Sequence, residues 1–315
     1  MPCHRGNVEP HDLRQGHHRQ RSLRHTARAL VACGQRDHRE LFFALALEDV
    51  RRAADLLRPV HDRSGGRDGF VSFECTPDLA DDTAATSAGL PAIEELTAAG
   101  INVNVTLLFS VDRYRQVLDA YQAGLETRVR AGEPVEHIAS VASFFVSRVD
   151  TKIDERVPDN SPLRGRAAIA NAAVAFATYQ ETITAQRWHN LSTAGARPQR
   201  PLWASTGTKN DAYSDVLYVE SLIAPDVVNT MPQATPDAFA DHGRTTNTIL
   251  DDDTMALGVL RGLARAGIDL DRVTAELESE GVTTFSDSYE QLLACIDERA
   301  SELTAIPTSK HGGAQ

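Results

Sequence analysis

Lysine is scarce in this chain of 315 residues. It occurs only at Lys152, Lys209 and Lys310, although lysine and arginine together number 32. Long apolar runs are absent as well, and a membrane-spanning helix needs roughly 18 or more consecutive apolar residues. The first residues contain no apolar segment of the kind that secretory signals carry. We therefore expect a cytoplasmic protein that does not associate with membranes.

Motifs of nucleotide and zinc chemistry are also missing. The chain contains no G-x-G-x-x-G after a strand pattern, no Walker A loop and no H-E-x-x-H. Its four cysteines lack metal-ligand spacing, which indicates reduced thiols. The acidic run at 251–253 would suit a divalent cation, but it precedes a helical pattern and fits a helix N-terminal cap better. We therefore predict no metal site.

The charge is distributed unevenly. The net charge is −12, yet residues 1–40 hold eight arginines and six of the 11 histidines against four acidic residues. This arm, residues 1–39, shows no strand alternation and few apolar residues, so we expect it to be disordered and separate from a folded domain at 40–315. It has no aromatic platform and no helix-turn-helix pattern, so we do not expect nucleic-acid binding.

The remaining chain alternates strand and helix patterns. Five stretches predict strands: 69–75, 101–110, 139–148, 201–206 and 226–232. Helical spacing predicts helices from residue 40 to an end at Pro59, and over 89–99, 112–131, 164–187 and 212–223, with two or three more in a tail at 251–305. Because no hairpin turns separate the strands, they indicate parallel βαβ units.

Polar side chains mark one face of several predicted strands. Glu74, Asn104, Thr106 and Ser143 lie on such faces, near the carboxyl ends where an α/β barrel places its chemistry. An open doubly wound sheet would instead be apolar on both faces. We therefore predict an α/β fold of the (β/α)8 TIM-barrel type. It is expected to be incomplete, with about five recognisable parallel strands and a helical C-terminal tail.

Four stretches carry a family resemblance. "INVNVTLLFS", "SVASFFVSRVD", "RPLWASTGTKNDAYSDVLYVESLIAPDVVNTMP" and "GVTTFSDSYEQLL" resemble transaldolase, particularly its longer bacterial subfamily. The resemblance implies a barrel that moves a dihydroxyacetone unit between sugar phosphates in the pentose phosphate pathway. It also implies a lysine Schiff base as electron sink, with neither metal nor cofactor. The oligomeric state stays open.

The resemblance assigns catalytic roles to three residues. Glu74 matches the family's acid/base carboxylate, which acts through a water molecule. Asn104 and Thr106 match the pair that holds the reaction intermediate and that water. The alternative for Glu74 is an ion pair inside the barrel. For Asn104 and Thr106 the alternative is a pair of inward-facing polar groups that satisfy each other.

Four further residues match substrate contacts. Ser143 and Phe145 correspond to residues that line the pocket, although a phenylalanine is more often plain core. Arg148 matches the family's phosphate anchor, and Lys209 takes the position of a second basic phosphate contact. For both cations the alternative is a surface salt bridge, which contributes little to stability.

One expected element is missing. In the family, the strand before "AGLPAI" carries the Schiff-base lysine, whereas here "AAT" runs directly into "SAGLPAI" at residues 84–93. The family's catalytic aspartate and Thr-Thr-Asn-Pro loop are likewise not recognisable in the arm, which fits a gene read in the wrong frame. Two functions therefore remain open: a transaldolase, or an inactive or truncated transaldolase-like protein that binds sugar phosphates.

Overall fold

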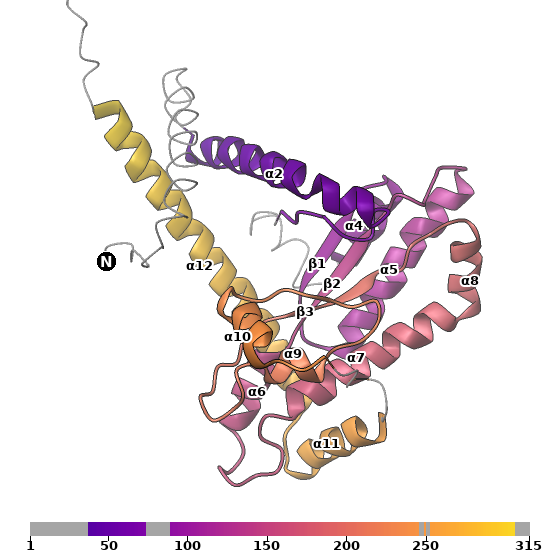
Figure 1. Cartoon of the computed structure of the whole chain (residues 1–315), viewed down its shortest axis with the longest axis vertical. Coiled ribbons are helices and arrows are strands. Elements are labelled where there is room, and N and C mark those ends of the chain that lie inside the picture. The colour runs from indigo at the N-terminus through magenta and orange to yellow at the C-terminus, as the bar shows by residue number, and fades with distance from the viewer. Residues whose placement is uncertain (1–36, 74–88, 246–248, 250–252, 306–315) are drawn as a thin grey trace, which may run out of the picture. The chain divides into compact units, whose positions relative to one another are not determined.

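The computed structural model describes residues 37–73, 89–245, 249 and 253–305 (Figure 1). The chain forms two compact units, one of Met1–Glu74 with Ser286–Gln315 and the other of Cys75–Phe285. The predicted basic arm falls almost wholly outside the described residues, as does the predicted catalytic Glu74.

In the first unit, helix α2 spans His38–Arg63. The side chain of Asp37 caps it by accepting hydrogen bonds from the backbone N–H groups of Arg39, at 2.8 Å, and Glu40, at 3.3 Å. The predicted end at Pro59 is wrong, because the helix continues through this residue to Arg63. Proline fixes φ near its helical value, and at this position it removes one backbone donor from the hydrogen bonds of the helix.

The predicted strand at 69–75 is not found. Residues 69–73 form no strand, and residues 74 and 75 lie outside the described part. The ring of Phe73 instead packs on those of Phe42 and Phe43, with centroids 6.4 and 6.2 Å apart. The alternation of polar and apolar residues in this stretch therefore marks an apolar side that packs on other rings. It does not mark a strand, because a strand needs a neighbouring strand for its backbone hydrogen bonds.

The second unit contains a four-stranded sheet. Its strands are β1 (Val103–Leu108), β2 (Ser140–Phe145), β3 (Arg200–Ala204) and β4 (Val228–Asn229). All pairings are parallel and follow the order β1-β2-β3-β4. The four predicted strands from 101 onward and their parallel direction are confirmed, and strands adjacent in sequence are adjacent in space, as in a (β/α) barrel.

Helices connect these strands and extend beyond them. They are α4 (Gly89–Ala98), α5 (Val111–Arg130), α6 (Ser147–Asp154), α7 (Ala167–Thr184), α8 (Gln186–Thr193), α9 (Leu217–Ser221), α10 (Ala234–His242), α11 (Asp253–Arg265) and α12 (Leu270–Ala305). The helical C-terminal tail is confirmed as two helices, and the predicted helix at 164–187 is divided between α7 and α8. The short α6 and α10 were not predicted. Among the described residues, no helix has the length and apolarity that crossing a membrane requires.

One face of the sheet supplies the main core. Figure 1 shows α5 and α7 beside this face, and the buried rings of Phe144 on β2 and Trp203 on β3 meet there with centroids 6.2 Å apart. The indole N–H of Trp203 donates to the carbonyl of Leu222 at 3.0 Å, so its one polar group is satisfied. On β1, by contrast, Asn104 and Thr106 are exposed, and their face of the sheet is the polar one.

Candidate functional site

Two predicted site residues meet across neighbouring strands. The hydroxyl of Ser143 on β2 donates to Oδ1 of Asn104 on β1 at 2.9 Å. Asn104 pairs in register with Val141, and side chains two residues apart on a strand share a face, so Ser143 lies on the face of Asn104. Thr106 lies on that face for the same reason. The structure thus brings these three residues onto one polar surface.

Phe145 and Arg148 form a second contact. Helix α6 begins at Ser147, directly after β2, and this places the guanidinium carbon of Arg148 5.6 Å from the ring centroid of Phe145. The Phe145 ring also packs on Phe109, with centroids 5.2 Å apart. Within the described part of the chain Arg148 makes no ion pair.

The carboxyl ends of β2, β3 and β4 are joined by polar groups that sequence reasoning missed. The hydroxyls of Ser147 and Ser205 lie 2.9 Å apart. The fully buried Thr206 donates its hydroxyl to Oδ1 of Asn229 at 2.7 Å. Ser205 adopts a positive φ of 55°, which turns the chain away from β3. In the sequence, the signal for this arrangement was the polar Ser-Thr pair that ends the predicted strand 201–206.

Asp150 on α6 is a buried carboxylate with two partners. It is 1% exposed, and it accepts hydrogen bonds from the backbone N–H of Ala168, at 2.8 Å, and the hydroxyl of Tyr218, at 2.9 Å. Burial raises the pKa of Asp150 from 3.8 to about 6, and the two hydrogen bonds limit that rise. Burial also raises the pKa of Tyr218, so its hydroxyl remains a donor.

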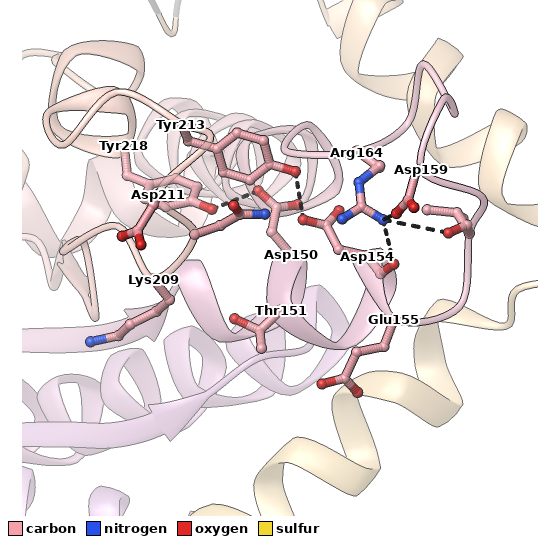
Figure 2. A pocket seen from close by; sticks show the side chains of 12 residues that line it. Asp150, Thr151, Asp154, Glu155, Asp159, Arg164, Lys209, Asp211, Tyr213 and Tyr218 are labelled. Carbon is pink, nitrogen blue, oxygen red and sulfur yellow. Dashed lines mark hydrogen bonds and ion pairs between the residues drawn. The ribbon is translucent and has the colours of Figure 1, made fainter.

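A pocket of about 660 Å³ lies beside this pair (Figure 2). Lys209 lines it from the segment after β3, and Asp154 lines it from the end of α6. The hydroxyl of Tyr213 donates to Oδ2 of Asp154 at 2.6 Å, and the backbone N–H of Gly165 donates to Oδ1 at 3.2 Å. Burial, followed by this hydrogen bond, raises the pKa of Tyr213 to about 12.

Lys209 itself is exposed and has no ion-pair partner among the described residues, although several carboxylates line the same pocket. In Figure 2 its side chain extends away from Asp150 and Asp154. Two cations, Arg148 and Lys209, therefore follow the neighbouring strands β2 and β3, and neither has a carboxylate partner in the part of the chain that the structure describes. Such cations can accept a phosphate group.

The other lysines are placed differently. The ammonium of Lys152 contacts Oε1 of Glu280 on α12 at 2.5 Å, and Lys310 lies outside the described residues. A lysine that attacks a carbonyl must be neutral, whereas an ion pair requires its ammonium form. Lys152 is therefore not arranged as a Schiff-base nucleophile.

Metal ligation has no support in the described residues, where no three His, Cys, Asp or Glu side chains are grouped as ligands. Of the acidic run at 251–253, only the backbone of Asp253 is described, and α11 begins there. The two readings of this run, cap and cation site, thus remain predictions.

A family model and several known proteins that resemble this chain point to the same family. The family model described as Transaldolase/Fructose-6-phosphate aldolase matches residues 83–296. The chain is 49% identical over 277 residues to Transaldolase 1 of Streptomyces coelicolor, covering 79% of this chain and 73% of the relative. It is 47% identical over 286 residues to the transaldolase of Thermobifida fusca, covering 82% and 77%. With the transaldolase of Parafrankia sp. the identity is 46% over 285 residues, covering 81% and 77%.

Proposed function

Because this chain belongs to the transaldolase/fructose-6-phosphate aldolase family, we propose that the polar face of its sheet binds a ketose phosphate. Transaldolases act on sugar phosphates in the pentose phosphate pathway, and the family implies a (β/α)8 barrel of which the four parallel strands are a part. In this proposal the substrate binds to the domain of residues 40–315, and residues 1–39 form a separate arm. The protein acts in the cytoplasm. It needs no cofactor and no nucleic acid.

One observation carries the proposal: Arg148 and Lys209 follow adjacent strands, and neither has a carboxylate partner among the described residues. Several other cations of the second unit form ion pairs, for example Arg187 with Glu126 at 2.7 Å. A phosphate dianion would satisfy both free cations, and charge-assisted hydrogen bonds of this kind are about twice as strong as neutral ones.

The remaining residues have complementary roles. In the proposal, Asn104 and Ser143 hold hydroxyl and carbonyl oxygens of the sugar through their amide and hydroxyl groups, whose mutual distance is 2.9 Å. Thr106 lies on the same face, and Phe145 supports Arg148 through its ring. Glu74 is proposed as the acid/base group from its family position alone, because it lies outside the described residues.

Transfer of a dihydroxyacetone unit needs an amine beside this surface. No described lysine meets that need, since Lys152 is ion-paired and Lys209 extends from an exposed position. We therefore propose that the chain binds transaldolase substrates but transfers the three-carbon unit at trace rates. Orientation of the substrate alone does not provide the electron sink that an imine supplies.

Calorimetric titration of the full chain with fructose 6-phosphate tests the binding. The expected result is saturable binding that falls about tenfold or more in Arg148→Gln, since a charged hydrogen bond contributes about 1.5–3 kcal/mol. Fructose without phosphate should bind equally weakly to both proteins. Arg115→Gln is the matched control, because Arg115 lies on α5 in its own ion pair with Asp112 at 2.6 Å. Equal affinity of the wild type and Arg148→Gln for fructose 6-phosphate would refute the assignment.

A further inference from the structure

Two carboxylate–phenol hydrogen bonds tie the segment that carries Lys209 to α6. This Lys209 segment comprises residues 205–216, and α9 follows it. Tyr213 in the segment binds Asp154 at 2.6 Å, and Tyr218 on α9 binds Asp150 at 2.9 Å (Figure 2). Asp150 and Asp154 are four residues apart on one helix, so they present their carboxylates from one face.

We propose that these two bonds, Asp154–Tyr213 and Asp150–Tyr218, position Lys209 relative to Arg148 for binding one phosphate group. The inference rests on the proposed function, since it concerns the same two cations. Arg148 is the second residue of α6, so the helix fixes the position of its backbone. Lys209 lies in an irregular segment, so its position depends on what anchors that segment to α6.

At its start the segment is bound to neighbours, through Ser205 to Ser147 of α6 and through Thr206 to Asn229 of β4. Closer to Lys209 the hydrogen bonds stay inside the segment. Thr208 donates its hydroxyl to the carbonyl of Ser214 at 2.8 Å, and Asn210 accepts from the N–H of Ala212 at 3.0 Å. These bonds shape the segment without fixing it to a neighbour. The bond from Tyr213 leads out of the segment to Asp154, and it is the shortest of the three.

The position of the Tyr213 ring requires a glycine at residue 165. Gly165 has a φ of +66°, and a Cβ atom added there would lie 2.9 Å from Cζ of Tyr213. The ring thus fits only because residue 165 has no side chain. At the same point the N–H of Gly165 donates to Asp154 at 3.2 Å, so one short stretch of chain orients both partners of the bond.

The phenols also keep the carboxylates from Lys209. A lysine beside acidic side chains would ordinarily form an ion pair, and a phosphate would then have to compete for it. Both oxygens of Asp154 already accept hydrogen bonds, from Tyr213 and Gly165, and both oxygens of Asp150 do so as well. The ammonium of Lys209 extends away from both side chains (Figure 2). It therefore stays available for an anion.

A double-mutant cycle tests this role. The single variants are Tyr213→Phe, which removes only the hydroxyl, and Lys209→Met, and the third protein carries both changes. Affinity for fructose 6-phosphate, fructose and inorganic phosphate is measured by calorimetry on the full chain. Tyr213→Phe should weaken fructose 6-phosphate and inorganic phosphate about two- to tenfold, the effect of one hydrogen bond, and leave fructose unchanged. In the Lys209→Met background it should have no further effect, because its action passes through the lysine.

Tyr121→Phe is the matched control. It removes a phenol hydroxyl that donates to the carbonyl of Arg197 at 2.8 Å, in the smaller core cluster of Tyr121, Leu125 and Trp188. Loss of stability without loss of phosphate affinity is expected for this variant. A thermal melt of every variant separates the two effects.

The outcomes separate the role of Lys209 from the role of the Tyr213 hydrogen bond. If Lys209→Met binds phosphate as the wild type does, the role of Lys209 in the proposed function fails and the inference fails with it. If Lys209→Met weakens binding but Tyr213→Phe behaves like Tyr121→Phe, only the inference is overturned. A further loss from Tyr213→Phe in the Lys209→Met background, or an equal loss for fructose, also overturns it.

Discussion

Asp150 and Tyr218 are 68 residues apart in sequence, yet the tyrosine hydroxyl donates to the aspartate at 2.9 Å inside the protein. This bond joins α6, which follows β2, to α9, which follows β3. The backbone N–H of Ala168, the second residue of α7, binds the other oxygen of Asp150. One buried carboxylate thus links the three helices α6, α7 and α9.

The stability of the protein should depend on the ionisation of Asp150. Its pKa is raised from 3.8 to about 6 by burial, so between these values the folded state binds a proton that the unfolded state has released. The contribution is fully present below about pH 4 and is lost as the pH rises through 6, by on the order of 2–3 kcal/mol. Urea unfolding of the wild type and Asp150→Asn from pH 4 to pH 8 measures it.

Asp150→Asn isolates this group from the other titrating carboxylates, such as Glu126, whose pKa is lowered by Arg187. The amide keeps an acceptor for Ala168 and can donate to the oxygen of Tyr218. The free energy of unfolding of Asp150→Asn should therefore rise relative to the wild type between pH 4 and pH 7. Parallel curves for the two proteins would contradict the prediction.

Gly165→Ala should cost more stability than Gly132→Ala. Both glycines have a positive φ, of +66° and +74°, but an added Cβ meets Tyr213 at 2.9 Å in the first case and nothing within 4 Å in the second. Backbone strain alone costs about 1–2 kcal/mol, and steric overlap adds to it at residue 165. Urea unfolding of the two variants, compared with the wild type, gives the difference. Equal losses would show that the contact with Tyr213 has no energetic consequence.

Thr206→Val should destabilise the sheet at its β3–β4 edge. The threonine is fully buried, and its hydroxyl binds Asn229 at 2.7 Å, so valine leaves the asparagine oxygen without this donor. The expected loss is about 1–3 kcal/mol in chemical unfolding. Thr206→Ser, which keeps the hydroxyl, should lose less. A higher free energy of unfolding for Thr206→Val than for Thr206→Ser would contradict the role of this hydrogen bond.

Borohydride trapping should detect no imine. The full chain is incubated with fructose 6-phosphate and sodium borohydride and then digested for mass spectrometry. No dihydroxyacetone adduct is expected on Lys152, Lys209 or Lys310, because a Schiff-base lysine needs a desolvated site that keeps it neutral. Lys152 is instead bound to Glu280.

The same protein should show no more than trace transaldolase activity in a coupled assay, with an active bacterial transaldolase as the positive control for trapping. A stoichiometric adduct on one lysine, abolished when that lysine is changed to alanine, would contradict the prediction. It would also identify the replacement nucleophile.

The elements whose residues repeat with a local period were predicted correctly from the sequence. The alternation of Asn104 and Thr106 with Val103 and Val105 predicted β1 and its polar face, and the structure exposes those two polar residues. Helices with an apolar stripe, such as α5, were found within a residue or two of their bounds. The segment 69–73 has the same alternation but forms no strand. Alternation shows which side of a segment is apolar, but it does not show whether a partner strand lies beside it.

The family, the parallel direction of the strands and the polar face were therefore determined by the sequence itself, since motif similarity and local periodicity depend on residues that are neighbours in the chain. The bonds of Asp150 to Tyr218 and of Asp154 to Tyr213 span 68 and 59 residues, and no pattern in the chain marks them. The packing of α6 against the segments after β3 decided that Asp150 and Asp154 have hydrogen-bond donors. It also left Arg148 and Lys209 without an ion pair among the described residues. That packing depends on the close fit of many side chains at once, Gly165 under Tyr213 among them, which a linear sequence does not display.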